Sequence, residues 1–144
     1  MEVKLIENAQ QRLFDFDKLF LDNYVFQIEA TTCLDEKDNR VNIIFPQGVA
    51  HYQVTFESWK ERILHDISEF RKQHDNQAWF FEVKSIKEYC KYLEYESYGL
   101  SENIYDHPDW YFIYVLLFQN CTIEVISYEK PLFVYSYTWQ HNKD

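Results

Sequence analysis

The side chains that could bind a metal ion or act as nucleophiles are few and widely separated. His65 and Glu69 form the only pair of metal ligands at helical spacing, and no Cys-x-x-Cys or paired histidines accompany them. Cys33, Cys90 and Cys121 fall on apolar faces of expected strands or helices. A catalytic cysteine needs a base within reach, so we expect these to be small core residues. We predict no metal, no cofactor and no catalytic residue.

The composition excludes several enzyme classes. The 144 residues include two glycines, so the chain cannot build a P-loop, a dinucleotide fingerprint or a nucleophile elbow. Twelve Phe, twelve Tyr and four Trp supply ample surface to bury, which predicts one folded domain over residues 1–144. The odd number of cysteines and the acidic start of the chain predict a cytoplasmic protein with reduced thiols.

The net charge of −10 indicates the kind of partner. Binding to nucleic acid or to an anionic membrane gains free energy from lysines and arginines beside phosphates, so neither is expected. The excess of acids is four in residues 1–40 (nine minus five) and four in residues 85–109 (six minus two). This distribution favours a basic protein partner.

The second acidic segment also contains tyrosines. Aromatic side chains anchor interfaces, and clustered carboxylates steer a basic partner into contact. The alternative is that the tyrosines pack at a sheet edge while the acids keep a loop solvated. The candidate partner-binding residues are Glu94, Tyr95, Glu96, Tyr98, Glu102, Tyr105, Asp106 and Asp109.

The hydropathy pattern predicts an alternation of strands and helices. Residues 1–22 are ambiguous, and we interpret Leu13, Phe16 and Phe20 as a helix face. From Tyr24 onward the period is two, which predicts a meander of three strands up to Phe56. Capping boxes at 58–61 and 85–88 predict two helices, separated by a strand over 78–84.

Three further strands are predicted at 110–119, 121–128 and 132–138. The first is apolar on both sides and is therefore expected at the centre of a sheet, covered on both faces. In the last, Phe133, Tyr135, Tyr137 and Trp139 share one face, which we expect a helix to cover. The predicted fold class is α+β, with a mostly antiparallel sheet of six to seven strands and two or three helices on one face.

Residues 78–138 combine an aromatic strand, a capped helix, an acidic loop and the apolar hairpin from Trp110 to Ile126. In this combination the chain resembles the small, acidic, aromatic-rich α+β immunity proteins of bacteria, which neutralise a toxin that is often a basic nuclease. The resemblance implies a mechanism of occlusion. The acidic segment would occupy the cationic groove of the toxin, with carboxylates in place of substrate phosphates.

Two other functions remain open from the sequence. The chain could be a small-molecule-binding domain whose ligand lies between the sheet and a helix, against the aromatic row of strand 132–139. It could instead be a structural subunit that forms a homodimer through the same strand.

Overall fold

The computed structural model describes most of the strands and part of the connecting chain. The described residues are 3–5, 15–34, 37–55, 80–84, 89, 104, 106–118 and 121–139. Strand makes up 71% of the interpretable residues and helical conformation 9%. The elements are β1 (Val3–Leu5), β2 (Asp15–Asp22), β3 (Val25–Leu34), β4 (Lys37–Phe45), β5 (Val49–Thr55), β6 (Phe80–Val83), the short 3₁₀ helix η1 (Pro108–Trp110), β7 (Phe112–Leu117), β8 (Thr122–Ser127) and β9 (Leu132–Trp139).

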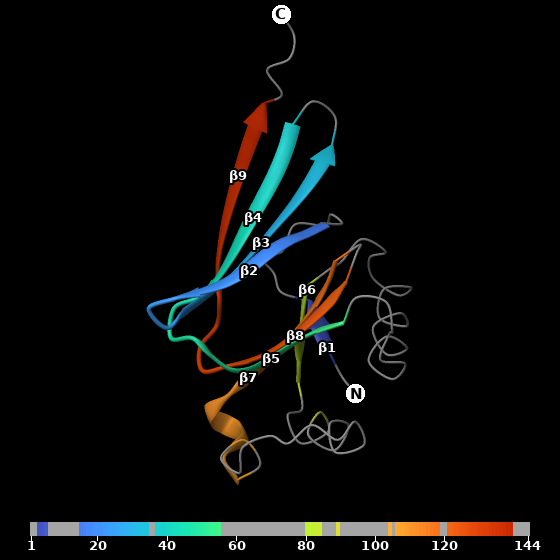
Figure 1. Ribbon diagram of the computed structural model, residues 1–144. Coiled ribbons are helices and arrows are strands. Elements are labelled where there is room, and N and C mark those ends of the chain that lie inside the picture. The colour runs from blue at the N-terminus through green and yellow to red at the C-terminus, as the bar shows by residue number, and fades with distance from the viewer. Residues whose placement is uncertain are drawn as a thin grey trace, which may run out of the picture.

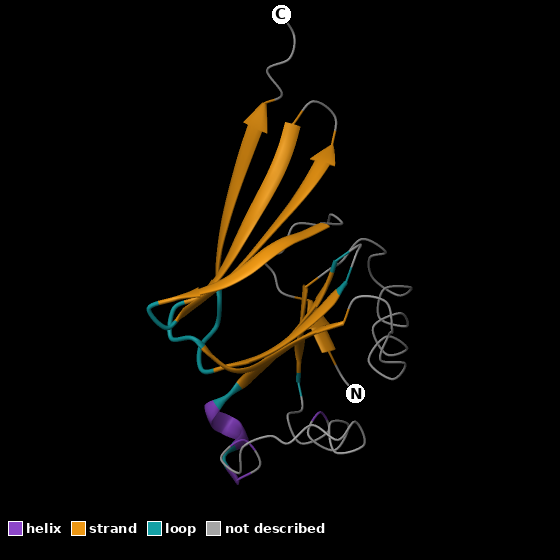
Figure 2. Ribbon diagram, in the orientation of Figure 1, coloured by secondary structure: helices purple, strands orange, loops and turns teal. Residues whose placement is uncertain are grey.

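The strands form two antiparallel sheets (Figures 1 and 2). One has five strands in the order β1-β6-β7-β8-β5, and the other has four in the order β2-β3-β4-β9. The chain changes sheets three times, and two of these connections, from β4 to β5 and from β8 to β9, lie at the left-hand end of Figure 1. This end of the molecule therefore gathers turns from both sheets.

An apolar core lies between the two sheets. Aromatic contacts join them: the ring centroids of Phe45 and Tyr114 are 6.0 Å apart, and those of Phe80 and Phe133 are 4.8 Å apart. Along β3 and β4 the buried residues alternate with more exposed ones, because one face of each strand contacts this core and the other faces solvent. The buried set from the two strands is Phe26, Ile28, Ala30, Val41, Ile43 and Phe45.

The predicted α+β fold with helices on one sheet is wrong, because the described residues form two sheets that pack on each other. Alternation correctly indicates which face of a strand is buried, but it does not say whether a helix or another sheet covers that face. Residues 58–75, expected to form the first capped helix, lie outside the described residues. Of the second, only Tyr89 is described, and it has helical conformation.

The predicted helix over residues 1–22 is also wrong where the structure describes it, since residues 3–5 and 15–22 are strands. The predicted helix face is not one face of the strand: Phe16 contacts the core, whereas Phe20 is level with Gln27 on the outer face of the sheet. The register with β3 shifts between Phe16 and Lys18, and Leu19 takes the next position on the core face. Leu13 lies outside the described residues.

The expected meander is partly correct. Strands β3 and β4 pair as predicted, but β5 leaves their sheet and pairs with β8. Within residues 110–119 the predicted central strand is confirmed for Phe112–Leu117, because β7 is central in the five-stranded sheet and Ile113–Leu117 are buried on both faces, whereas Trp110 lies in η1. Phe133 and Tyr135 pack against the core between the sheets, where β6 takes the place of the expected covering helix.

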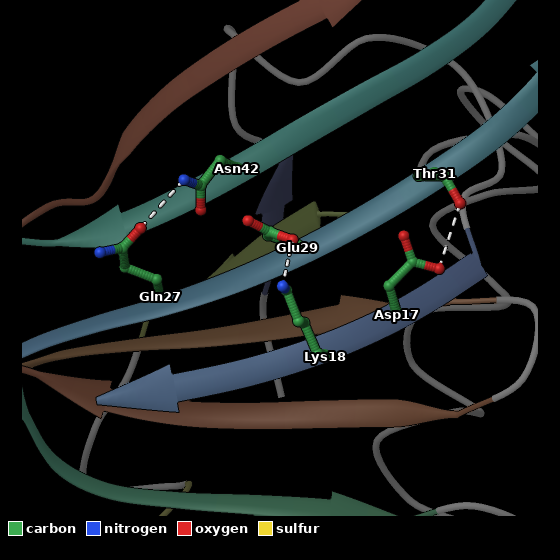
Figure 3. A network of polar contacts seen from close by, with 6 residues as sticks. All are labelled: Asp17, Lys18, Gln27, Glu29, Thr31 and Asn42. Carbon is green, nitrogen blue, oxygen red and sulfur yellow. Dashed lines mark hydrogen bonds and ion pairs between the residues drawn. The ribbon is translucent and has the colours of Figure 1, made fainter. Parts of the chain in front are cut away.

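On the outer face of the four-stranded sheet, β9 exposes the apolar Leu132 and Val134, whereas β2, β3 and β4 carry polar contacts. Three contacts join neighbouring strands there: Thr31 Oγ1 donates to Asp17 at 3.2 Å, Asn42 Nδ2 donates to Gln27 at 3.0 Å, and Lys18 lies 3.5 Å from Glu29 (Figure 3). Exposed pairs of this kind contribute little to stability. These contacts keep the outer face hydrated. The stability of the sheet therefore comes mainly from the apolar core on its opposite face.

Candidate functional site

Three turns meet at the end where the chain changes sheets. They connect β2 to β3, β4 to β5 and β8 to β9 (Figure 2). Residues from all three turns line one hollow of about 550 Å³. Its lining comprises Leu19, Phe20, Leu21, Tyr24, Phe26, Gln47, Gly48, Val49, Ala50, His51, Tyr52 and Tyr128.

The rim of the hollow carries large apolar side chains that are exposed. The exposed fractions are 66% for Leu21, 85% for Tyr24, 46% for Tyr52 and 47% for Tyr128. We call these four residues the turn surface. Below them, the ring of buried Phe26 lies 5.0 Å from that of Tyr52, which ties the rim to the core. Exposed aromatic residues around a hollow are typical of binding surfaces.

Tyr24 is held in a backbone conformation that disfavours a tyrosine. Asn23 and Tyr24 have φ values of 47° and 70°, as expected for a two-residue hairpin turn in which both central residues are left-handed. Asn tolerates this conformation, but the second position usually carries glycine. The tyrosine side chain is exposed and adds little to the core, so stability does not account for its presence here.

Gly48 lets the neighbouring turn approach Tyr24. Its φ is 77°, its amide donates to the carbonyl of Phe45 at 3.0 Å, and Pro46 occupies the turn between them. A Cβ atom on Gly48 would lie 2.7 Å from the backbone oxygen of Tyr24. Only glycine therefore allows the two turns to pack this closely.

The segment that precedes β7 lies against the turn surface. The ring of Tyr111 is 5.5 Å from that of Tyr128. In η1 the amide of Trp110 donates to the carbonyl of His107, and the two rings stack with centroids 3.9 Å apart. The indole remains 57% exposed, so it extends the aromatic surface beyond Tyr128.

Exposed carboxylates lie close in sequence to these aromatic side chains. Asp22 precedes the first turn and Glu129 follows Tyr128, while Asp106 and Asp109 flank His107; all four are exposed. Within the described ranges, the one ion pair is Lys18–Glu29 on the outer face of the four-stranded sheet. The four carboxylates at this end are thus available to a partner.

The structure places two of the eight residues predicted to bind a partner. Asp106 and Asp109 are exposed and lie beside and within η1, close in sequence to Tyr111, which contacts the turn surface. The other six lie outside the described residues: Glu94, Tyr95, Glu96, Tyr98, Glu102 and Tyr105.

The sequence analysis missed the turn surface itself. Tyr24 and Tyr52 were interpreted only as members of strand faces, because their alternation with apolar neighbours is regular. Asn23, placed between two alternating segments, was the available signal for a hairpin turn.

The two buried carboxylates of the described region, Glu82 and Glu124, lie apart from each other. Glu82 is level with Tyr114 on β7, whereas Glu124 is level with the next residue, Val115, so the two carboxylates lie on opposite faces of the sheet. Glu124 accepts a hydrogen bond from the hydroxyl of Tyr89 at 2.6 Å. Each buried acid therefore has its own surroundings, apart from the other.

Cys121 is a core residue, as predicted. It is fully buried, and burial raises the pKa of its thiol to about 11. The thiol remains protonated at neutral pH and is a poor nucleophile. In the part of the chain that the structure describes, no group of three or more His, Cys, Asp or Glu side chains could hold a metal ion.

No helix within the described ranges is long and apolar enough to cross a membrane. Comparison with models of known protein families, with characterised proteins and with solved structures finds no match to this chain. Candidate functions must therefore be argued from the turn surface and its charges.

Proposed function

We propose that this protein is a non-catalytic binding protein of the immunity type, which neutralises a basic protein such as a nuclease toxin by covering its cationic site. The observation that carries the proposal is Tyr24, an aromatic side chain 85% exposed on a strained turn. Strain of this kind persists where function requires the residue. Tyrosine is also among the residues that most often dominate the binding energy of interfaces.

The charges around the turn surface support a basic partner. The chain carries a net charge of −10, and Asp22 and Glu129 adjoin the aromatic rim. Through the contact of Tyr111 with Tyr128, η1 and Asp109 lie next to the same rim. Carboxylates around aromatic anchors steer a cationic surface into place and pair with its lysines and arginines. The acidic segment up to Asp109 would extend this interface.

The first test uses the protein as bait in extracts of its source cell. We expect it to retain a basic protein whose toxicity, when expressed in a test host, is relieved by co-expression of this chain. Tyr24→Gly should weaken the complex on the order of 30-fold, which corresponds to about 2 kcal/mol for an anchor residue. Loss of binding with an unchanged fold would assign the anchor to the turn surface. Retention of no basic protein would contradict the proposal.

A pair of matched charge reversals distinguishes attraction of the partner by carboxylates near the turn surface from the effect of the net charge of the whole chain. Asp22 and Asp15 lie at opposite ends of β2, and both are exposed. With the captured partner, Asp22→Lys should slow association several-fold at low salt, while Asp15→Lys should have a smaller effect. The triple variant Glu96→Lys, Glu102→Lys and Asp106→Lys tests the acidic segment in the same way. Equal association rates for all variants would remove the acidic surface from the mechanism.

A second candidate function is favoured by the hollow itself. A volume of about 550 Å³ with an aromatic lining is in the range of small-molecule sites. This site differs from the one expected from the sequence, since Phe133 and Tyr135 pack against the core and do not line the hollow. A ligand from a metabolite panel that raises the melting temperature, and loses this effect in Tyr52→Ala, would support this function over protein binding.

A further inference from the structure

The two edges of the four-stranded sheet differ in chemistry. β2 carries four charged residues, Asp15, Asp17, Lys18 and Asp22, and its bulge interrupts the ladder with β3. Charges and bulges are the usual protection of a sheet edge against pairing with another chain. β9, from Leu132 to Trp139, has no charged residue and no proline, and its register with β4 is unbroken over eight residues.

The outer edge of β9 is free among the described residues. The strand pairs with β4 on one side, and no described strand pairs with the other; in Figure 1 it forms the left-hand border of its sheet. Every second residue of such a strand directs its N–H and C=O groups away from the sheet. On the outer face of the sheet, Leu132 is 56% and Val134 52% exposed. Among the described residues, β9 therefore offers an edge without a partner strand, together with exposed apolar side chains.

We propose that β9 pairs with β9 of a second copy, in antiparallel orientation, and joins two four-stranded sheets into one continuous sheet. The absence of charge on this edge favours a second copy over a basic partner. In a chain of net charge −10, an uncharged edge strand such as β9 allows two copies to approach without close like-charge pairs. Because β2 is protected, the assembly stops at two copies instead of continuing as a fibre.

The symmetry of the pair restricts its register. Residues directly opposite each other on antiparallel strands lie on the same face of the sheet. Since even-numbered and odd-numbered residues of β9 lie on opposite faces, each residue must pair with one of the same parity in the second copy, so the two residue numbers sum to an even value. The two registers nearest the centre of the strand place Val134 opposite Ser136 of the second copy, or Ser136 opposite itself. Both positions are exposed on the outer face, so charges introduced there meet each other across the two-fold axis in either register.

The test is the mass of the full chain in solution. Light scattering over a range from micromolar to hundreds of micromolar should show a transition from 17.7 kDa to twice this mass. Added salt should strengthen the dimer by screening the repulsion between two acidic chains, whereas it should weaken binding of a basic partner. A mass that stays monomeric over the whole range would overturn the proposal, and would leave the separate turn surface unaffected.

Substitutions on β9 locate the interface. The double variant Val134→Lys with Ser136→Lys should raise the dissociation constant at least tenfold, because lysines then face one another across the axis. The corresponding double glutamate variant should behave in the same way. A mixture of the two should form heterodimers, because opposite charges then meet.

The matched control is Thr31→Lys with Ile44→Lys, which adds the same two charges to the same face on the inner strands β3 and β4. It should dimerise like the parent chain. Melting curves establish that each variant is folded. If both lysine pairs abolish the dimer equally, or if the mixed variants remain monomers, β9 is not the interface.

Discussion

The two sheets have the same antiparallel pairing but opposite relations to water. In the five-stranded sheet, every residue of β8 and nearly every residue of β7 is buried, so both faces of its centre are covered. In β3 and β4 of the four-stranded sheet the buried residues alternate with more exposed ones, and the outer face carries the polar contacts of Figure 3 and the exposed side chains of Leu132 and Val134. The difference assigns stability mainly to the first sheet. The second, with its turns and its free edge, offers more surface for binding.

The largest expected change in the free energy of unfolding comes from replacing a leucine with alanine in the five-stranded sheet, compared with the same replacement in the four-stranded sheet. Leu116 of β7 is fully buried, whereas Leu132 of β9 is 56% exposed. Leu116→Ala should lower the free energy of unfolding by about 2–5 kcal/mol, because it removes core contacts and leaves a cavity. Leu132→Ala should change it by less than about 0.5 kcal/mol at dilute, monomeric concentration. Equal losses in urea denaturation would show that the two sheets contribute alike.

The free energy of unfolding should also fall at alkaline pH, because Cys121 is buried beside the five-stranded sheet. Burial raises the pKa of this thiol to about 11, whereas the ordinary value is near 9. Since the unfolded chain releases this proton first, the contribution of Cys121 is complete below pH 9 and is lost as the pH rises towards 11. The slope is about 1.4 kcal/mol per pH unit for one group.

This contribution can be isolated by difference. Unfolding of the parent chain and of Cys121→Ala should be compared at pH 8 and pH 10.5. Other thiols and tyrosines titrate in both proteins, so only the change in the gap between the two proteins reports on Cys121. We expect the gap to narrow at the higher pH. A constant gap would mean that the thiol ionises as readily in the folded protein as in the unfolded chain.

The same contrast explains what could be predicted from the sequence. Residues 110–119 are apolar on both sides, and this pattern correctly indicated a central strand covered on both faces. The alternation from Phe26 to Phe45 correctly indicated the buried faces of β3 and β4. Alternation does not identify the partner strand, so the change of sheet at Pro46 was missed. In β2, the spacing of Phe16 and Phe20 indicated a helix, although the two side chains lie on opposite faces of the strand.

The candidate site was less predictable, because it depends on turns that come together only in the folded chain. The carboxylates at Asp106 and Asp109 follow from charge counting, and the structure describes both as exposed. Tyr24, Tyr52 and Tyr128 are far apart in sequence, and each follows a regular strand pattern. They come to one hollow only in the folded chain, through the turn from β2 to β3 and the connections from β4 to β5 and from β8 to β9.

The close packing of these turns can be tested at Gly48. Gly48→Ala should destabilise the protein by at least about 1–2 kcal/mol, because alanine disfavours a φ of 77°. Its Cβ would also meet the backbone oxygen of Tyr24. Gln47→Ala, at an exposed position in the same turn, is the control and should be close to neutral. Similar melting temperatures for the two variants would show that the turns have room to separate.

The smallest expected change in stability is at Tyr24, and there the substitution should stabilise the protein. Tyr24→Gly removes the strain of a left-handed tyrosine, about 1–2 kcal/mol, and loses part of this gain to the greater freedom of glycine in the unfolded chain. We therefore expect a net stabilisation of about 0.5–1 kcal/mol. Tyr24→Ala removes the same side chain and keeps the strain, so its stability should stay near that of the parent.

Denaturation and partner binding should be measured together on these two variants. If both bind weakly and only the glycine variant is more stable, the tyrosine is retained for its contact at the expense of stability, as is common at functional sites. A less stable glycine variant would show instead that the exposed ring supports the turn. In that case the exposure of Tyr24 would be incidental, and the four-stranded sheet would lose its strongest indication of a binding role.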